Sequence, residues 1–280
     1  MNPVVAVIAA GGMGSAVGAR LTESGVRVLT SLEGRSAASA ARAKAAGMIA
    51  ASDPEIATAD IVLSIVPPGE ALSLAQRLAP ALSAANRKPV YADCNAVNPE
   101  TVKKIAAVIA LTGCPFVDAG IIGGPPRAGY KGPTFYVSGE NAPKVEPLND
   151  LGLVFRKMDG PIGAASALKM SFGGITKGLI AIGSAMTLAA HRAGVAEALQ
   201  AELAASQPDV LAYLTRMVPG MPPKAYRWVA EMEEVASFTG SEAEREMYQA
   251  IAAFYERLAQ DSAKEEVEAL SGFFPKAKSN

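Results

Sequence analysis

The 280-residue sequence has little of several residue types that specialised proteins need. Its two cysteines, Cys94 and Cys114, cannot form the disulfide framework of a small secreted domain, and its single histidine leaves no Cys/His spacing for a metal site. Neither sign of charge is in excess, because 26 Lys and Arg face 27 Asp and Glu and the net charge is -1. We therefore expect no nucleic-acid partner and no acidic disordered tail, and we expect a small-molecule substrate instead.

Long apolar runs are also missing. The apolar stretch Val4–Ala10 leads directly into glycines, without the basic segment and cleavage site of a signal peptide. The longest later run, Gly178–Ala190, is shorter than the roughly 20 residues that span a bilayer, and Lys177 and His191 flank it. These features predict a cytoplasmic protein without a membrane partner, long enough for two domains that each bury a core.

The first half of the chain alternates short apolar runs with helical spacing. Val4–Ala9, the helical pattern of Met13–Ser24 and the β-rich run Val26–Leu29 together predict a βαβ unit. Further apolar runs predict strands at 61–66, 89–93 and 115–120, with helices at 71–81 and 99–111 and two more strands, 134–139 and 153–158, at the far edge. Strands that are buried on both faces and alternate with helices indicate a parallel, doubly wound sheet.

From Ala164 the pattern becomes helical. One long helix runs to about Gly194, and helices interrupted at Pro208, Pro219–Pro223 and Gly240 follow. The sequence thus predicts an α/β fold in which a Rossmann-type domain, residues 1–162, precedes an all-helical domain, residues 163–280.

The segment "IAAGGMG", Ile8–Gly14, joins the first strand to the first helix. A turn that binds a dinucleotide pyrophosphate needs a tight bend, a position without a side chain beside the anion, and close packing of helix on strand. Gly11 and Gly14 meet the last two needs, whereas Ala9 stands where the first glycine is usual. The placement between strand and helix favours a nucleotide turn over a structural loop. The expected cofactor contacts are Ala10, Gly11, Gly12, Met13 and Gly14.

The end of the second strand indicates which dinucleotide binds. An acidic residue there takes the ribose 2'-OH of NAD, whereas Arg and hydroxyl groups accommodate the 2'-phosphate of NADP. Glu33 would repel that phosphate, but Arg35, flanked by Ser31 and Ser36, can form a charge-assisted contact with it. We favour NADP over NAD. The alternative is that Glu33 and Arg35 are ordinary solvated loop charges.

Four segments in this order resemble the β-hydroxyacid dehydrogenase superfamily, which includes 3-hydroxyisobutyrate and 6-phosphogluconate dehydrogenases and, more distantly, imine reductases. "IAAGGMG" resembles its IGxGxMG turn, and "YADCNAVNPET" (Tyr91–Thr101) resembles its D-x-S-T-x-x-P segment. "FVDAGIIGGPPRAG" resembles its D-A-P-V-S-G-G substrate segment, and "GAASALKMSFG" (Gly163–Gly173) its lysine-containing catalytic helix. "AYRWVAEMEEVA" (Ala225–Ala236) and "SLEGRS" resemble the branch whose C-terminal domain is of the DUF1932 type.

The resemblance implies a dehydrogenase or reductase mechanism centred on Lys169. In this family the lysine moves the proton of the substrate hydroxyl while hydride passes between the substrate carbon and the nicotinamide. It further implies a homodimer that packs through the helical domain. The remaining cofactor contacts are assigned to Val66, Pro67, Pro68 and Asn95.

Three positions depart from the family pattern. The serine of D-x-S-T is Asn95 here, the serine of the substrate segment is Ile122, and the asparagine one turn after the lysine is Gly173. The changes at Ile122 and Gly173 remove two polar groups that would hold a substrate carboxylate or hydroxyl, so we expect a bulkier or less polar secondary alcohol, ketone or imine. The expected substrate contacts are Asn95, Gly120, Ile121, Ile122, Gly123, Gly124 and Gly173. The glycines of the long helix can alternatively serve close packing.

Two other functions stay open: an imine reductase, and a non-catalytic NADP-binding sensor. Imine reductases often carry another residue in place of the lysine, and a sensor would lose its acid/base first, so Lys169 favours the dehydrogenase. His191 is expected to contact the C-terminal end of its helix rather than to catalyse. Tyr226, Arg227 and Trp228 are open between core packing and a neighbouring subunit's cleft.

Overall fold

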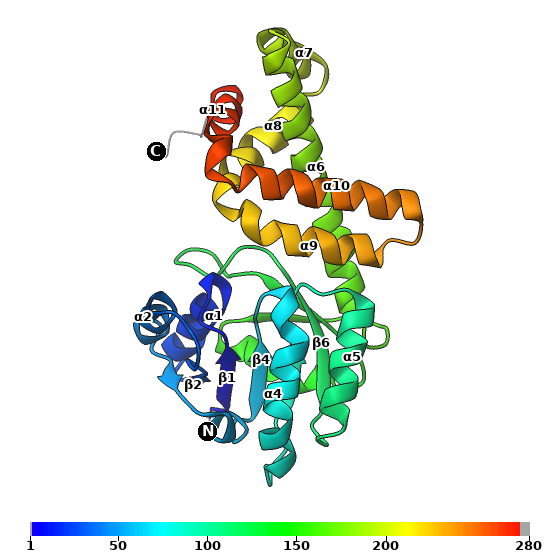
Figure 1. Ribbon diagram of the computed structural model, residues 1–280. Coiled ribbons are helices and arrows are strands. Elements are labelled where there is room, and N and C mark those ends of the chain that lie inside the picture. The colour runs from blue at the N-terminus through cyan, green and yellow to red at the C-terminus, as the bar shows by residue number, and fades with distance from the viewer. Residues whose placement is uncertain (1, 275–280) are drawn as a thin grey trace. The chain divides into compact units, whose positions relative to one another are not determined.

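The N-terminal half of the molecule is built around one eight-stranded sheet. The computed structural model describes residues 2–274 (Figure 1). The strands are β1 (Val4–Ile8), β2 (Arg27–Thr30), β3 (Ile49–Ala50), β4 (Ile61–Ser64), β5 (Val90–Asp93), β6 (Phe116–Ile122), β7 (Thr134–Ser138) and β8 (Val154–Lys157). They lie in the order β3-β2-β1-β4-β5-β6-β7-β8. Strands β1 to β6 are parallel, β7 runs antiparallel to β6, and β8 is parallel to β7. The doubly wound sheet and its two far-edge strands are thus confirmed.

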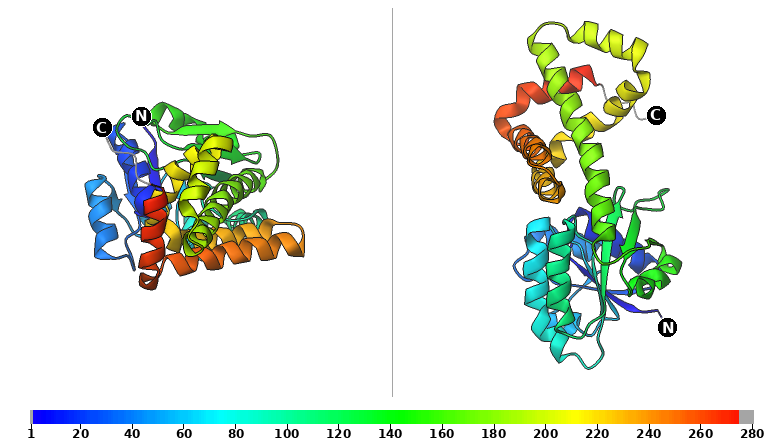
Figure 2. Two further views of the ribbon diagram at one scale, coloured as in Figure 1. Left: turned by 90° about the horizontal axis from the view of Figure 1, so that it is seen from above. Right: turned by 90° about the vertical axis from the view of Figure 1, so that its right-hand side faces the viewer.

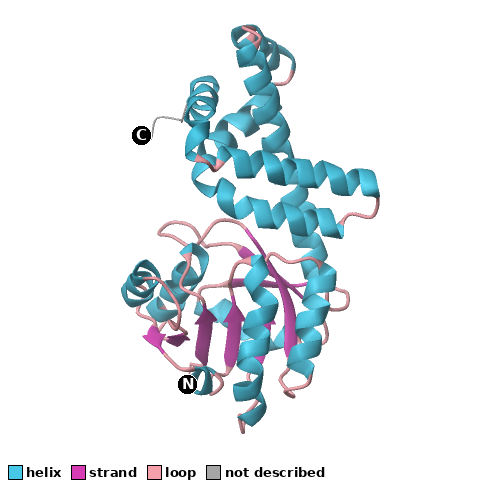
Figure 3. Cartoon of the chain, viewed as in Figure 1, coloured by secondary structure: helices cyan, strands magenta, loops and turns pink. Residues whose placement is uncertain are grey.

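Helices cover both faces of this sheet (Figure 3). They are α1 (Gly12–Glu23), α2 (Ala37–Ala45), α3 (Asp53–Ile56), α4 (Ala71–Ala84) and α5 (Pro99–Ala110), with 3-10 turns at η1 (Pro68–Glu70) and η2 (Ala142–Leu151). Successive residues of β1 point to opposite faces: Val5 and Val7 pack in the core under α1, and Ala6 and Ile8 in the core that α4 and α5 cover. This two-sided burial explains why the strands read as continuous apolar runs.

The sequence predicts no element between β2 and β4, where the structure has α2, β3 and α3. Of the nine residues of α2 only Ala43 is buried, and both residues of β3 are exposed. Without a buried face these segments carry no hydrophobic period.

The chain forms two compact units whose boundary falls between Met170 and Ser171, inside the long helix α6 (Ala164–Arg192). The helices that follow are α7 (Ala196–Ser206), α8 (Pro208–Met217), α9 (Ala225–Phe238), α10 (Glu242–Leu258) and α11 (Lys264–Phe273), with 3-10 turns at η3 (Val218–Gly220), η4 (Pro222–Lys224) and η5 (Asp261–Ala263). Pro208 begins α8 and Gly240 separates α9 from α10, as the sequence predicts. Figures 1 and 2 show α9 and α10 side by side as a helical hairpin.

Helix α6 differs from the sequence expectation in one respect. Within the described residues it is long and apolar enough to cross a membrane, judged by length and composition alone, and 44% of its apolar window is buried. Core helices of soluble proteins share these properties. The expectation of no membrane partner therefore stays a prediction.

Candidate functional site

The start of α1 has the geometry of an anion-binding turn. Gly11 is the N-cap, and no side chain caps the helix, so the first backbone N–H groups of α1 are not consumed by a side-chain cap. Methyl groups built on Gly11 and Gly12 would meet nothing within 4 Å, whereas one on Gly14 would overlap the carbonyl oxygen of Ala9. Gly14 thus serves the close packing of helix on strand, and Gly11 and Gly12 leave open space above the N–H groups. The turn therefore fits a dinucleotide diphosphate.

Ala9 can replace the usual first glycine of this turn. Among the described residues, no residue other than glycine has a positive φ, so Ala9 adopts a backbone conformation that a side chain tolerates. The N–H of Gly11 donates to the Ala9 carbonyl at 2.9 Å and closes the bend. The turn occupies the carboxyl end of β1, next to β4, where the strand order reverses. Ligands of open α/β sheets bind at this position.

Arginine side chains contact the segments around the end of β2. The Arg35 guanidinium lies 2.7 Å from the Glu70 carboxylate, which links the loop after β2 to η1, just after the predicted contacts Val66–Pro68. Arg42 donates to the Ala10 carbonyl of the nucleotide turn at 3.0 Å. Arg77 donates to the predicted ligand Ser31 at 3.2 Å. Arg42 and Arg77 escaped sequence reasoning because they lie on helices away from the motif.

The other predicted phosphate ligand, Ser36, is the N-cap of α2. Its hydroxyl accepts a hydrogen bond from the N–H of Ser39 at 3.3 Å. Glu33 is exposed and has no described partner in this structure. The residues that would repel and attract a 2'-phosphate are thus both present around the loop, and Arg77 also pairs with Asp53 at 3.3 Å.

Asn95 joins the ends of β4 and β5. Its Oδ1 accepts from the N–H of Val66 at 2.7 Å, and its Nδ2 donates to Ser64 Oγ at 2.8 Å and to the carboxylate of Asp93. The side chain is almost fully buried. Asn95 therefore holds the predicted cofactor contact Val66 in place, and its direct contact with cofactor or substrate stays a prediction.

Asp93 is a buried carboxyl that sequence reasoning did not single out. Its pKa is raised to about 7, chiefly by burial and to a lesser extent by the nearby charge of Asp118, while hydrogen bonds from Asn95 oppose the rise. Its Oδ2 has no hydrogen-bond partner in the part of the chain that the structure describes. The sequence signals were an acidic residue at the end of an apolar strand and its place as the first residue of the segment that resembles D-x-S-T.

The carboxylate of Asp118 on β6 fixes the beginning of α6. It accepts hydrogen bonds of 2.7 to 3.3 Å from the backbone N–H groups of Gly163, Ala165 and Ser166 and from the hydroxyls of Ser138 and Ser166. An anion at a helix N-terminus satisfies the unpaired N–H groups and the helix dipole together. The cap sets the rotation of α6 on the sheet.

Lys169 follows this cap on α6 and reaches the end of β6. Its Nζ donates to the carbonyl of Ile121 at 2.8 Å. Gly120 makes the approach possible, because a methyl group there would lie 2.7 Å from the Ala165 carbonyl and 3.1 Å from Lys169 Cβ. The structure thus brings Lys169 together with the predicted substrate contacts Gly120 and Ile121.

The glycines of α6 have two different roles. A methyl group on Gly174 would lie 2.9 Å from the Tyr248 hydroxyl, and one on Gly183 would lie 2.6 Å from Leu214, so both positions serve helix packing. A methyl group on Gly173 would meet only Lys177 Nζ, at 3.7 Å. Packing among the described residues therefore explains Gly174 but leaves Gly173 unexplained.

The aromatic candidates of α9 differ in burial. Trp228 packs edge-on against Tyr255, with 5.2 Å between ring centroids, and Lys177 Nζ lies 5.6 Å from its ring centre. For Trp228, these contacts fit the core-packing alternative. Tyr226 is exposed and lies beside Arg227. His191 lies in the last turn of α6, at the end of the helix where the dipole interacts favourably with a positive charge.

The raised pKa of Asp93 makes stability depend on pH. A carboxyl whose pKa is about 7 in the folded chain and 3.8 ordinarily favours folding when protonated. This contribution is fully present below the unfolded pKa and is lost as the pH rises through the folded pKa. From about pH 5 to about pH 8, wild-type protein should lose about 2 to 3 kcal/mol of unfolding free energy relative to Asp93→Asn.

Urea titrations across this pH range, followed by circular dichroism, measure the difference. Asp150→Asn, at an exposed aspartate, is the matched control and should follow the wild-type curve. Parallel curves for wild type and Asp93→Asn would contradict a raised pKa at this carboxyl.

Comparisons with known proteins identify the family of the nucleotide-binding domain. Residues 4–154 match the family model of the NAD binding domain of 6-phosphogluconate dehydrogenase, and residues 190–258 match a domain of unknown function, DUF1932. An uncharacterized 28.5 kDa protein encoded in a 7S RNA 5' region of Methanothermus fervidus is 33% identical over 176 residues. That match spans 62% of this chain and 66% of the relative, so the chain covers just under two thirds of the relative's length.

Solved structures share the fold over nearly the whole chain. The conserved protein MTH1747, of unknown function and described as similar to 3-hydroxyacid dehydrogenases, superposes with a TM-score of 0.68 at 29% identity over 94% of this chain and 98% of its own. Mycobacterium tuberculosis 3-hydroxyisobutyrate dehydrogenase with L-serine gives a TM-score of 0.72 at 19% identity, covering 97% and 99%. Imine reductases share the fold as well. The chain belongs to the family of the NAD binding domain of 6-phosphogluconate dehydrogenase, with a DUF1932 domain after the nucleotide-binding domain, and it shares its fold with the 3-hydroxyacid dehydrogenases.

Proposed function

We propose that the protein uses NADPH to interconvert a secondary alcohol and its ketone, with Lys169 as the acid/base. The observation that carries this proposal is the bond from Lys169 Nζ to the Ile121 carbonyl. It holds the ammonium at the carboxyl end of β6, and the nucleotide turn lies at the carboxyl end of β1 in the same sheet. Both groups therefore lie at the sheet edge where such folds bind ligands.

Different residues of the chain bind the cofactor, transfer the proton and orient the lysine. A bound nicotinamide supplies the hydride chemistry. Gly11, Gly12 and the first N–H groups of α1 bind the diphosphate. Lys169 donates a proton to the substrate oxygen when a ketone is reduced, and its neutral amine takes that proton back when an alcohol is oxidised. The Ile121 carbonyl orients the amine for both directions.

The substrate segment favours a weakly polar substrate. Ile121, Ile122, Gly123 and Gly124 carry no polar side chain, and Gly173 adds none one turn after Lys169. A carboxylate at this segment would depend on backbone N–H groups alone for its hydrogen bonds. A bulky ketone needs only one polar contact, at its oxygen, which Lys169 provides. Imine reduction is the alternative activity, and Lys169 as the acid/base favours the carbonyl substrate.

Removing the ammonium group tests this mechanism. Lys169→Met should lower kcat/KM for NADPH-dependent ketone reduction by at least about 100-fold, because general acid catalysis contributes that much. The Kd for NADPH should stay within a factor of about two, since Lys169 does not hold the diphosphate. Steady-state kinetics and fluorescence titration measure the two quantities. Lys144→Met, at an exposed lysine of η2, is the control. Unchanged ketone turnover by Lys169→Met would exclude the mechanism.

The preference for NADPH is proposed from Arg35, which the Glu70 carboxylate orients, with Arg42 and Arg77 on neighbouring helices. Arg35→Met should weaken NADPH binding about tenfold and leave NADH binding nearly unchanged, because NADH has no 2'-phosphate for Arg35 to contact and the Glu70 ion pair that is also lost involves no nucleotide group. Fluorescence titrations with both nucleotides measure this, and Arg87→Met, at an arginine that is 83% exposed and pairs with Asp60, is the control. Tighter binding of NADH than NADPH by the wild-type protein would contradict the proposal.

We also propose a homodimer through α6. Five large apolar side chains of this helix are exposed by 45 to 62% and recur at alternating spacings of three and four residues: Phe172, Ile175, Leu179, Ile182 and Met186. This is the seam pattern of a coiled coil, which is complementary to a second copy of itself. A monomer would leave the whole stripe in water.

Charge in this seam should separate the subunits. The double variant Leu179→Glu/Ile182→Glu should halve the mass in light scattering, because two carboxylates cannot be buried against their copies. Val210→Glu, at an apolar residue of α8 with 46% exposure, is the control and should keep the wild-type mass. A monomeric wild-type protein at micromolar concentration would contradict the dimer.

A further inference from the structure

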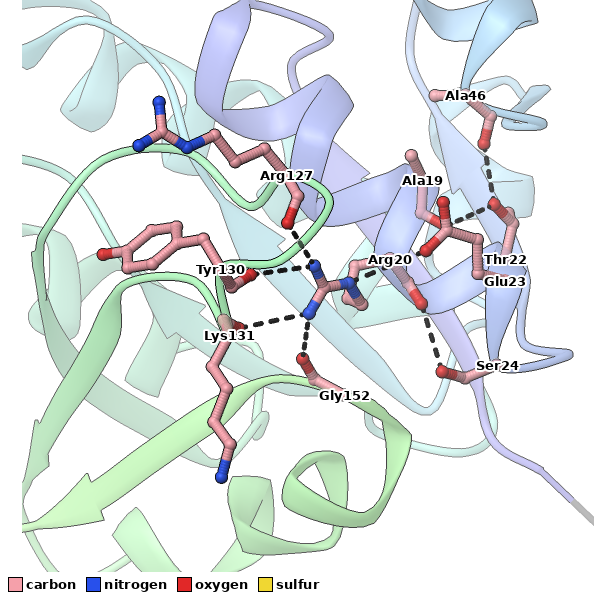
Figure 4. Close-up of polar contacts among 10 residues, drawn as sticks. All are labelled: Ala19, Arg20, Thr22, Glu23, Ser24, Ala46, Arg127, Tyr130, Lys131 and Gly152. Atoms are coloured by element: carbon pink, nitrogen blue, oxygen red, sulfur yellow. Dashed lines mark hydrogen bonds and ion pairs between the residues drawn. The ribbon is translucent and has the colours of Figure 1, made fainter. Parts of the chain in front are cut away.

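Arg20 on α1 binds a loop that is more than 100 residues away in the sequence. Its guanidinium donates to the backbone carbonyls of Arg127, Tyr130, Lys131 and Gly152 at 3.2 to 3.4 Å (Figure 4). Its Nε also lies 3.6 Å from the carboxylate of Glu23, and the side chain is only 21% exposed. Every nitrogen of the guanidinium is therefore engaged. A fork of fixed donors is suited to collecting several carbonyl oxygens at one point.

The loop that Arg20 binds, residues 123–133, connects β6 to β7 and begins with the substrate segment's Gly123 and Gly124. Most of its residues are exposed. In the described structure, the bond from the N–H of Tyr130 to the Arg127 carbonyl, at 3.1 Å, is the one backbone bond within residues 124–132. The loop therefore has little structure of its own, and Arg20 supplies most of its hydrogen bonds.

The Tyr130 side chain of this loop lies next to the substrate segment. A methyl group built on Gly123 would lie 2.8 Å from the Tyr130 hydroxyl and 3.0 Å from Pro133 Cα. Gly123 also has a φ of +125°, which side chains rarely adopt. The phenol thus lies against the bare backbone of Gly123, two residues after the carbonyl that binds Lys169. Figure 4 shows the Tyr130 ring pointing away from the Arg20 guanidinium. Arg20 therefore holds the backbone of the loop and leaves the Tyr130 side chain available to contact a ligand.

A hydroxyl at this position supplies what the segment lacks. The side chains of residues 121–124 are two isoleucines and two glycines. A polar group of a substrate beside them can bond to backbone N–H groups or to Tyr130. Because a phenol both donates and accepts, it can bond to a hydroxyl, an ether or a carbonyl group without adding charge. This suits the weakly polar substrate proposed above.

We propose that Tyr130 contacts the substrate through its hydroxyl and that Arg20 is a positioning residue that acts through Tyr130. The inference rests on the proposed oxidoreductase function. Because α1 begins in the nucleotide turn and carries Arg20 two turns later, one helix sets the position of both the diphosphate site and the substrate loop. A shift of α1 of about 1 Å would move Tyr130 with it, and misplacements of this size lower rates substantially.

Five variants separate the substrate contact of Tyr130 from the support that Arg20 gives it. The substrate is whichever ketone of cyclohexanone, acetophenone and 2-octanone the wild-type protein reduces fastest with NADPH. Tyr130→Phe should raise its KM about tenfold, since one neutral hydrogen bond is lost, and change kcat by less than about threefold. Arg20→Met should give a similar rise. The double variant should be no worse than either single variant, because residues that act as a unit are not additive.

Glu23→Gln is the matched control, since it removes the partner of Arg20 and keeps all four carbonyl bonds; it should behave as wild type. Fluorescence titration should give an unchanged Kd and stoichiometry for NADPH in every variant, which shows that the nucleotide site is folded. Hydrogen exchange in residues 124–132 should accelerate in Arg20→Met but not in Tyr130→Phe or Glu23→Gln. Arg20→Lys should recover part of the protection and part of the KM.

The outcomes distinguish this inference from the function on which it rests. If Lys169→Met abolishes ketone turnover while Tyr130→Phe keeps the wild-type KM, the contact with substrate is wrong and the oxidoreductase stands. Additive effects of Tyr130→Phe and Arg20→Met would show that Arg20 does not act through Tyr130. If the wild-type protein reduces none of the ketones, the proposed function fails and this inference fails with it.

Discussion

The position of Lys169, the proposed acid/base, depends on one buried carboxylate. Removing a charge from water costs several kcal/mol unless hydrogen bonds replace its hydration. Asp118 meets this condition with donors from the first turn of α6 and from two serines. Because those donors exist only when α6 starts at this point with this rotation, burial of Asp118 specifies the geometry of the helix. Lys169 follows on the same helix, and the Ile121 carbonyl completes a two-point attachment of α6 to β6.

Asp93 shows what happens to a carboxyl in the same layer with fewer donors. Its bond to Asn95 only partly offsets burial, and the charge of Asp118 disfavours a second negative charge nearby. Protonation is the remaining way to reduce the cost, which is why its pKa rises. Since Asn95 bonds to both Asp93 and the N–H of Val66, the proton on Asp93 is connected by two hydrogen bonds to the backbone expected at the cofactor.

The sequence predicted those parts of the molecule whose physics is local. Strands buried on both faces appear as apolar runs, and the turn at Gly11–Gly14 is a short motif, so the sheet and the nucleotide turn were found. Helix α2 and β3 were missed because they bury almost nothing. Arg20, Arg42 and Asp118 were not found for a different reason. Each bonds to backbone groups far along the chain, and a carbonyl or an N–H group has no sequence signature.

Two adjacent glycines in α6 show how structure separates explanations that sequence leaves open. Glycine within a helix costs about 1 kcal/mol relative to alanine, so each needs a reason. Gly174 has one, because the Tyr248 hydroxyl would be 2.9 Å from any β-carbon there. Gly173 has no such neighbour among the described residues, yet it lies one turn after Lys169 on the same helix. Side chains four residues apart on a helix are neighbours. The missing side chain at Gly173 therefore leaves room on the helix face one turn after Lys169, which the proposed bulky substrate would need.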